Sequence, residues 1–138
     1  MADFYEDDVV AWSDQQAARA ANELDWDDIA EEIADVGQRQ RDQTESRLGV
    51  ACEHLLKWQF QPDHRSGSWR GSILAVRNRI ARLLQRMPSL QTYPAAVVAD
   101  AFRDGRAKAA AETGLEDLPE SCPWTIEQVL DRDFWPDA

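Results

Sequence analysis

The sequence has little of what flexible loops, strands and membrane spans require. Its 138 residues contain only six glycines and six prolines, and alanine is frequent, a composition that favours helix over strand. Uninterrupted apolar runs are a few residues long, so none reaches the length of a bilayer span. The segment from Met1 to Asp8 carries acids where a signal peptide needs bases and an apolar run. We therefore expect a helical, cytoplasmic protein with no membrane partner.

Cysteine and catalytic motifs are scarce as well. Cys52 and Cys122 are too few and too far apart in the sequence for a disulfide framework or a thiolate metal site, and we interpret them as two free thiols. The sequence contains no P-loop, no nucleophile elbow and no HExxH zinc motif. It therefore predicts no catalytic residues and no cofactor.

What the chain does have is charge sorted into blocks. Residues 1–35 hold twelve acids and one base, residues 36–90 hold ten bases and four acids, and residues 91–138 hold four bases and ten acids. The net charge is −11 at pH 7. Because opposite charges attract in a partly buried setting, we expect the basic middle to fold back on the two acidic ends.

The length fits one domain with a single core. A first amphipathic helix is expected from about Glu6 to Asn22, with acids in its first turn. Asp25 is positioned to cap a second helix over about 27–60. An apolar stripe at spacings of three and four predicts the buried side of this helix and begins with Trp26, Ile29, Ile33 and Val36.

The middle of the second helix is polar. Residues 37–47 contain no large apolar side chain, the stripe resumes at Leu48, and no proline interrupts the segment before Pro62. A continuous helix over 27–60 would be about 50 Å long against about 30 Å for its neighbours, so part of it would overhang. The polar middle is then a solvated section, a hinge at a glycine, or a polar self-association surface.

The third helix is expected after the turn-rich segment 62–68, with Ser68 as its N-cap and Pro88 at its end. Its apolar residues form a heptad seam: Trp69, Ile73, Val76, Ile80, Leu83 and Met87. Four arginines border this seam: Arg70, Arg77, Arg79 and Arg86. Because interhelical ion pairs form beside such seams, we expect these arginines to pair with carboxylates from both ends of the chain.

A fourth helix is expected from about Pro94 to Gly114, and its small residues, Gly105 among them, predict close approach of a neighbouring backbone. A miniature helix follows, in which Thr125 and Gln128 form a capping box. The predicted fold class is therefore all-α: a single-domain helical bundle of four main helices, the second long, plus a short C-terminal helix.

Several sequence blocks, in order along nearly the whole chain, resemble one family. They are FYEDDVVAW at 4–12, IAEEIADVG at 29–37, HLLKWQFQP at 54–62, PSL at 88–90, ETGL at 112–115 and CPWTIEQVLD at 122–131, with Arg65, Ser68 and Trp69 between them. This set resembles the DUF29 family of small bacterial proteins. The resemblance implies an all-helical fold and supplies no catalytic residues, because the family has no assigned function.

An enzymatic alternative depends on acidic residues. Glu31, Glu32 and Asp35 place carboxylates along one helix, as in helical nucleotide hydrolases that hold Mg²⁺ through oxygen ligands. The second acidic pair would come from Asp100 and Asp104, which are four residues apart. Since the apolar stripe turns the first group towards solvent, we expect no metal site there.

A nucleic-acid-binding alternative depends on six arginines in and just before the third helix: Arg65, Arg70, Arg77, Arg79, Arg82 and Arg86. Phosphate contacts use such side chains. The acidic total and the twelve acids of residues 1–35 argue against a nucleic-acid partner, because they repel a polyanion at long range.

We favour the hypothesis of a helical interaction module that binds another protein or self-associates. The chain contains six tryptophans, and tryptophan and arginine are enriched at binding hot spots. The candidate partner-binding residues surround the turn between the second and third helices: Trp58, Arg65, Trp69, Arg70 and Arg77. The alternative is that these tryptophans fill the core and stabilise that turn.

Overall fold

Helices dominate the computed structural model of the chain, which describes residues 8–21 and 27–137. Within these ranges there are five α-helices, two short 3-10 helices and no strand. The α-helices are α2 (Val9–Ala21), α3 (Asp27–Phe60), α4 (Gly67–Arg86), α5 (Tyr93–Thr113) and α6 (Ile126–Leu130), and the 3-10 helices are η1 (Pro62–His64) and η2 (Pro88–Leu90). The all-α prediction is confirmed. The expected helix ends at Glu6 and Asn22, and Asp25 and Trp26, lie outside the described residues.

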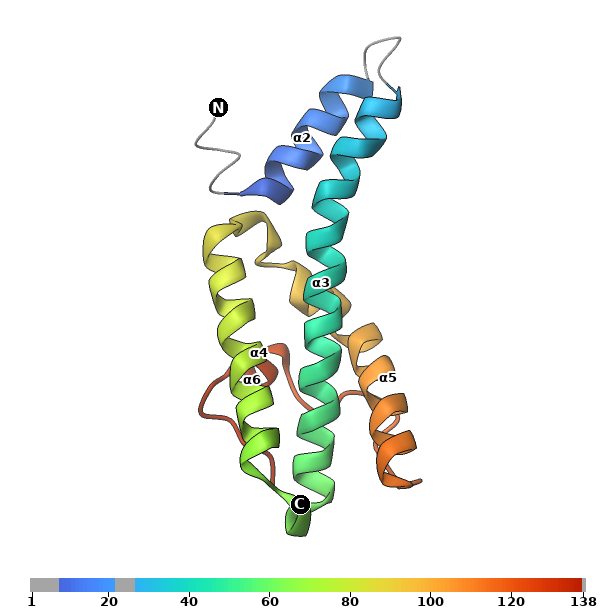
Figure 1. Cartoon of the computed structure of the whole chain (residues 1–138), viewed down its shortest axis with the longest axis vertical. Helices are drawn as coiled ribbons and strands as arrows, with labels where there is room; N and C mark the ends of the chain where they lie inside the picture. The colour runs from blue at the N-terminus through green and yellow to red at the C-terminus, as the bar shows by residue number, and fades with distance from the viewer. Residues whose placement is uncertain (1–7, 22–26, 138) are drawn as a thin grey trace.

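Helix α3 runs without a break through residues 37–47 and contacts α2, α4 and α5. Figure 1 shows α2 against its N-terminal half, with α4 and α5 on either side of its C-terminal half. The α2–α3 hairpin therefore projects beyond the rest of the bundle, as the expected difference in helix length requires. The continuous second helix is confirmed, and the hinge is not observed.

Asp8 fixes the start of α2 to the segment after α4. Its side chain caps the helix, because the backbone N–H of Ala11 donates to Asp8 Oδ1 at 2.9 Å. Asp8 also accepts from the backbone N–H of Ser89 at 2.6 Å and from the Ser89 hydroxyl at 2.7 Å. One buried carboxylate thus links two segments about 80 residues apart in the sequence.

Gly37, a possible hinge in the sequence, is instead a contact point between α2 and α3. Its backbone N–H donates to the hydroxyl of Ser13 at 3.1 Å, and a Cβ at Gly37 would lie 3.0 Å from that oxygen. Nearby, Arg41 forms an ion pair with Asp14 across the same two helices. One side of the polar middle is therefore an interhelical surface and not a solvated one.

The core lies around the C-terminal half of α3. Its residues are Leu48, Ala51, Cys52, Leu55, Leu56, Ile73, Ile80, Val97, Ala101, Phe102, Ala109, Leu118, Trp124 and Val129. Phe102 of α5 meets Trp124 of the C-terminal tail edge to face, with ring centroids 6.1 Å apart. The stripe that resumes at Leu48 is thus the part of α3 that organises the bundle.

Glycines bring α3 and α5 into backbone contact. A Cβ built on Gly105 would lie 2.5 Å from the carbonyl oxygen of Gly49 and 2.9 Å from the backbone nitrogen of Glu53. Real Cβ atoms do not approach backbone so closely, so the two helices could not keep this separation with any other residue. The expected close approach at Gly105 is confirmed.

The helix ends follow the predicted caps with one exception. Gly114 ends α5 in the left-handed conformation at φ 73°, and Thr125 and Gln128 form the expected capping box. The expectation that Ser68 caps the third helix is wrong, because Ser66 has the extended backbone and accepts from the backbone N–H of Trp69 at 3.2 Å. Ser66 and Ser68 are both suitable caps, and the extended backbone at Ser66 makes it the N-cap.

A second correction concerns the apolar stripe at the start of α3. Ile33 and Val36 are half-buried, whereas Ile29 is 39% exposed. The prediction that Ile29 marks the buried side is wrong. In the described ranges α2 alone packs against this end of α3, and a single helix covers only part of its neighbour's surface.

We predict that Gly105→Ala lowers the free energy of unfolding by about 1–3 kcal/mol, because the new methyl group forces α3 and α5 apart. The measurement is urea unfolding followed by circular dichroism at 222 nm. Gly71→Ala in α4 is the matched control, since nothing lies within 4 Å of its Cβ position and the change is expected to stabilise by about 0.5–1 kcal/mol. Equal effects of the two substitutions would contradict the close approach.

Candidate functional site

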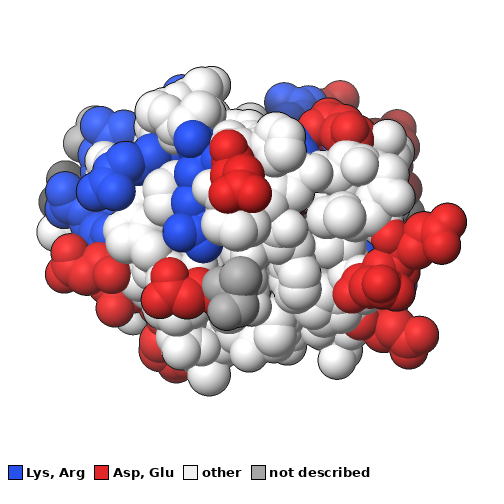
Figure 2. Space-filling model, turned by 90° about the horizontal axis from the view of Figure 1, so that it is seen from below, with Lys and Arg blue, Asp and Glu red and all other residues white. Residues whose placement is uncertain are grey.

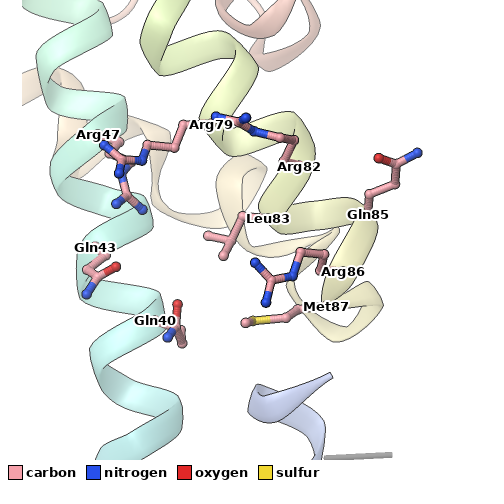
Figure 3. Close-up of a pocket in the computed structure, with 9 residues that line it drawn as sticks. All are labelled: Gln40, Gln43, Arg47, Arg79, Arg82, Leu83, Gln85, Arg86 and Met87. Atoms are coloured by element: carbon pink, nitrogen blue, oxygen red, sulfur yellow. The ribbon is translucent and has the colours of Figure 1, made fainter. Parts of the chain in front are cut away.

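A concave hollow lies between the polar middle of α3 and the C-terminal half of α4 (Figure 3). Its volume is about 540 Å³. The lining residues are four arginines, three glutamines and two apolar residues: Arg47, Arg79, Arg82, Arg86, Gln40, Gln43, Gln85, Leu83 and Met87. None of them is acidic. We call this hollow the arginine cleft.

Helix geometry places these arginines around one hollow. Ile80 of the heptad seam is fully buried and faces the core. Arg79, Arg82 and Arg86 follow each other at spacings of three and four, so they share a face of α4 beside that seam, and all three are exposed. Arg47 reaches the same space from the facing helix, as Figure 3 shows. Sequence analysis missed Arg47; the signal was an arginine in a polar stretch opposite the arginine-rich helix.

No carboxylate of the described residues neutralises the positive charge in the cleft. Burial lowers the pKa of Arg47, and the nearby positive charge of Arg79 lowers it further. Within residues 8–21 and 27–137, no carboxylate forms an ion pair with any of the four cleft arginines. Like charges held close together in a partly buried setting repel, so an anion that enters the cleft lowers the electrostatic energy.

Among the described residues, none of the four third-helix arginines forms the expected ion pair with a carboxylate. Arg79 and Arg86 line the cleft, and the guanidinium of Arg70 lies 4.7 Å from the centroid of a tryptophan ring in the tail. Burial lowers the pKa of Arg77, with an opposing contribution from Asp131. The cause is the surface that faces α4 here: the polar middle of α3 presents glutamines and another arginine, not acids.

Basic surface continues around α4 from the cleft. Arg79 and Arg82 also border a neighbouring hollow of about 500 Å³, together with Asn78 and Arg132. Figure 2, which looks along the bundle from the end opposite the α2–α3 hairpin, shows most of the visible basic side chains gathered on one side, with acidic side chains both beside this group and on the opposite side.

The residues that the sequence suggested for partner binding form a second cluster, at the C-terminal tail. The rings of Trp58 and Trp135 have centroids 4.8 Å apart, and the Arg65 guanidinium lies 4.9 Å from the centre of the Trp58 ring. Arg65 also donates to the carbonyl of Trp58 at 2.7 Å and to that of Pro136 at 3.3 Å. These contacts attach the tail to the end of α3. Trp69, at the start of α4, is half-buried.

Arg77 belongs to the interior of this cluster. It is 1% exposed, and its Nε donates to the carbonyl of Val129 at 2.8 Å while its Nη2 donates to that of Gln128 at 3.3 Å. Its guanidinium lies 5.2 Å from the centre of the Trp135 ring. A cation therefore satisfies the last carbonyls of α6, where the helix dipole favours positive charge. A partner that binds the folded surface does not reach this side chain.

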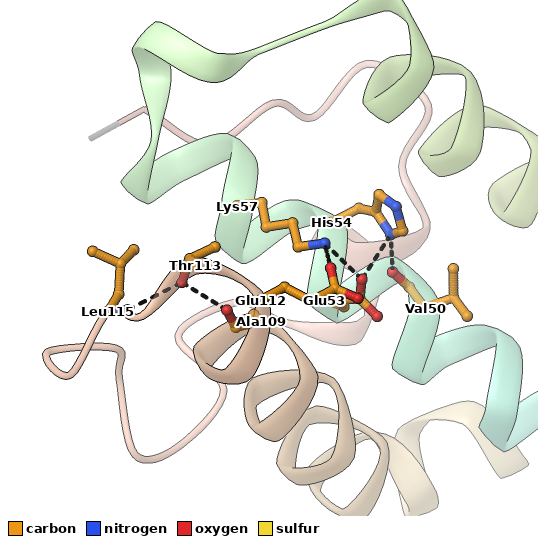
Figure 4. Close-up of polar contacts among 8 residues, drawn as sticks. All are labelled: Val50, Glu53, His54, Lys57, Ala109, Glu112, Thr113 and Leu115. Carbon is orange, nitrogen blue, oxygen red and sulfur yellow. Dashed lines mark hydrogen bonds and ion pairs between the residues drawn. The ribbon is translucent and has the colours of Figure 1, made fainter.

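A third polar group joins α3 to the end of α5 (Figure 4). The ammonium of Lys57 donates to Glu53 at 2.9 Å and also pairs with Glu112. Burial disfavours the charged form of Lys57, yet the hydrogen bonds to Glu112 and Glu53 raise its pKa. His54 Nδ1 lies 2.8 Å from the carbonyl oxygen of Val50 in its own helix. These groups are paired with each other, which is the arrangement of a structural contact.

The acidic candidates for a metal site do not meet. Glu31, Glu32 and Asp35 are exposed near the start of α3, whereas Asp100 and Asp104 are exposed on α5, which packs against the other half of α3. In the part of the chain that the structure describes, no group of three or more His, Cys, Asp or Glu side chains could hold a metal ion.

The two cysteines, far apart in the sequence, are neighbours in the fold. Cys52 is buried in α3, and Cys122 of the tail packs against the core that contains it. A hydrogen bond from Cys52 lowers the pKa of the Cys122 thiol to about 7, although burial acts in the opposite direction. The same hydrogen bond and burial raise the pKa of Cys52. Both are free thiols, as the sequence predicted, and their proximity in the fold was not predicted.

Together, the fold and the cleft define a small all-α protein with a basic hollow on its surface. Its sequence matches the family described as "Domain of unknown function DUF29" over residues 4–135, so the chain belongs to the DUF29 family. No curated protein and no solved structure matches the sequence. None of the helices that the structure describes is long and apolar enough to cross a membrane.

We predict that Trp135→Ala lowers the free energy of unfolding by about 2–3 kcal/mol, because it removes the ring that contacts Trp58, Arg70 and Arg77. Hydrogen exchange of the amides at 131–136 should accelerate in the same variant. Trp69→Ala is the control: this tryptophan is equally half-buried but lies outside the ring stack, so exchange in the tail should stay unchanged. Unchanged hydrogen exchange at 131–136 in Trp135→Ala would show that the Trp135 ring does not hold the tail in place.

We also predict selective alkylation of Cys122 by iodoacetamide, with a rate that is half-maximal near pH 7. Cys52 should react only on unfolding, because it is 0% exposed. Peptide mass spectrometry measures both sites. In Cys52→Ala, which lacks the hydrogen-bond donor, the midpoint for Cys122 should move to higher pH, and an unmoved midpoint would show that Cys52 is not the cause.

Proposed function

We propose that this chain is a protein-binding module whose arginine cleft holds an acidic segment of a partner protein. The observation that supports the proposal most directly is the set of four guanidinium groups around one hollow, none paired with a described carboxylate. Arginines with an internal structural role use their donors within the protein, as Arg65 and Arg77 do by donating to backbone carbonyls.

The chemistry of the lining suits carboxylates. A guanidinium is planar, always charged and weakly hydrated, and it donates two parallel hydrogen bonds to a carboxylate. Three glutamine side chains add neutral donors and acceptors, and Leu83 and Met87 supply apolar surface between the arginines. Methionine adapts to partners of different shape. The lining contains no Asp, Glu, His, Cys, Ser or Lys side chain, so it offers recognition without a nucleophile or a general base.

Charge also favours a short acidic segment over a nucleic acid. The chain carries a net charge of −11, and the resulting long-range repulsion grows with the charge of the ligand. A peptide with a few acids experiences much less repulsion than a duplex, which carries one charge per about 1.7 Å. The second candidate function is nucleic-acid binding through α4. Arg79, Arg82 and Arg86 on one face support it, and the net charge of −11 opposes it.

Partner contact at Trp58, Arg65, Trp69 and Arg70 stays a prediction from the sequence. Trp58 and Arg65 already contact each other and the tail, which accounts for them without a partner. Arg70 is exposed and Trp69 is half-buried, so these two form the accessible part of that cluster.

We predict that a fluorescein-labelled peptide of alternating aspartate, glutamate and leucine binds the protein at about 0.15 M salt and is released at about 1 M, where screening is short-ranged. The double variant Arg79→Glu with Arg82→Glu should bind at least about tenfold more weakly, as measured by fluorescence anisotropy. Arg103→Glu with Lys108→Glu is the control, because it makes the same change in net charge at exposed positions of α5, away from the cleft.

Two results would contradict this function. The first is equal peptide affinity in the cleft variant and the α5 control. The second is that a labelled single-stranded oligonucleotide of similar charge binds more tightly than the peptide and that only the cleft variant loses this binding. That result would favour nucleic-acid binding as the function of the cleft.

A further inference from the structure

The projecting end of the α2–α3 hairpin is acidic. Residues 27–35 of α3 carry five acids and no base: Asp27, Asp28, Glu31, Glu32 and Asp35. The last four are exposed, and none of these four forms an ion pair with another described residue. Figure 1 shows this part of α3 beyond the reach of α4 and α5. We call residues 27–35 the acidic tip.

The acidic tip also carries an exposed apolar side chain. Ile29 is the large hydrophobic residue that stands out from the surface of the described chain, at 39% exposure. Glu32 lies three residues further along the helix, so its carboxylate borders this side chain. An isoleucine beside a carboxylate on a projecting helix end is the pattern of a small docking surface with an apolar centre and a charged rim.

The arginine cleft has the complementary pattern. Its apolar residues, Leu83 and Met87, lie among four arginines (Figure 3). An inserted isoleucine would find apolar contacts there, while the carboxylates beside it would meet guanidinium groups. The tip and the cleft thus match in both charge and polarity.

The two surfaces of one molecule cannot meet. Both include residues of the same continuous helix, and from Glu31 to Arg47 that helix extends about 24 Å at 1.5 Å per residue. A helix packed along its length by α2, α4 and α5 does not fold back on itself. A tip can therefore enter only the cleft of another copy.

We propose that the acidic tip of one copy of this chain docks in the arginine cleft of a second copy, with Ile29 placed between the arginines against Leu83 and Met87. This inference rests on the proposed function, because it names the partner that the cleft takes. Two reciprocal contacts close a dimer, and successive single contacts form a chain of copies.

The association should be weak and sensitive to salt. A helix end in a shallow hollow buries less than the roughly 1,200–2,000 Å² of a stable interface. Two copies of net charge −11 also repel, but at about 0.15 M salt the Debye length of about 8 Å screens that long-range repulsion more than the contacts inside the cleft. We therefore expect self-association at concentrations of about 100 μM at this ionic strength, and its loss near 1 M salt.

The test weakens the charge of each surface in a separate variant and then mixes the two variants. In sedimentation velocity, the cleft variant Arg79→Glu with Arg82→Glu and the tip variant Glu31→Arg with Glu32→Arg should each be monomeric where the unmodified protein associates. Mixed in equal amounts, they should associate again, because the unmodified acidic tip of the cleft variant then meets the unmodified arginine cleft of the tip variant. Ile29→Ser should weaken association of the unmodified protein about tenfold without changing its charge.

Controls and outcomes separate this inference from the proposed function. Arg103→Glu with Lys108→Glu and Glu116→Arg with Asp117→Arg match the net charges of the two variants at exposed positions elsewhere, and both should associate like the unmodified protein. Circular dichroism confirms that each variant is folded. A monomeric unmodified protein at about 500 μM, or a mixture that stays monomeric, would overturn self-docking. Binding of the acidic peptide in that case would leave the proposed function standing.

Discussion

The structure depends on one helix that is longer than everything packed against it. The C-terminal half of α3 is apolar and lies between α4 and α5, where the backbone contact at Gly49 and Gly105 sets the spacing. Its N-terminal half is polar and has only α2 beside it in the described ranges. The overhang follows from this difference in length, and it creates both a projecting acidic end and an open basic hollow beside α4.

Because both surfaces include residues of one continuous helix, about 24 Å apart along it, their charges cannot neutralise each other within a molecule. The chain uses some arginines internally: Arg65 and Arg77 donate to carbonyl groups near helix ends and stack on tryptophan rings. It leaves others, such as Arg47 and Arg79, close together without a described counter-ion. The first set holds the tail in place, and the second remains available to an anionic partner.

Much of the fold could be predicted because local spacing controls it. Apolar repeats of three and four residues located α3 and α4, and local capping residues such as Gly114 and Thr125 located helix ends. The sequence did not distinguish Ser66 from Ser68 as the N-cap of α4, because both are serines. Only the path of the backbone after η1 distinguishes them. The residues that the sequence suggested for partner binding do not line the cleft. Its α4 arginines were recognised only for the nucleic-acid alternative and as ion-pair partners, and Arg47 was not recognised.

By itself, the sequence determined the helices, their lengths and the sign of charge along each segment, because these depend on residues within a few turns of each other. The tertiary structure decided which segments face one another. It placed Cys52 beside Cys122, turned Arg77 inwards towards α6, and set Arg47 opposite Arg79 across a hollow. Such pairs join residues on different helices, and their meeting depends on how the helices cross and pack in three dimensions, which no spacing along the chain encodes.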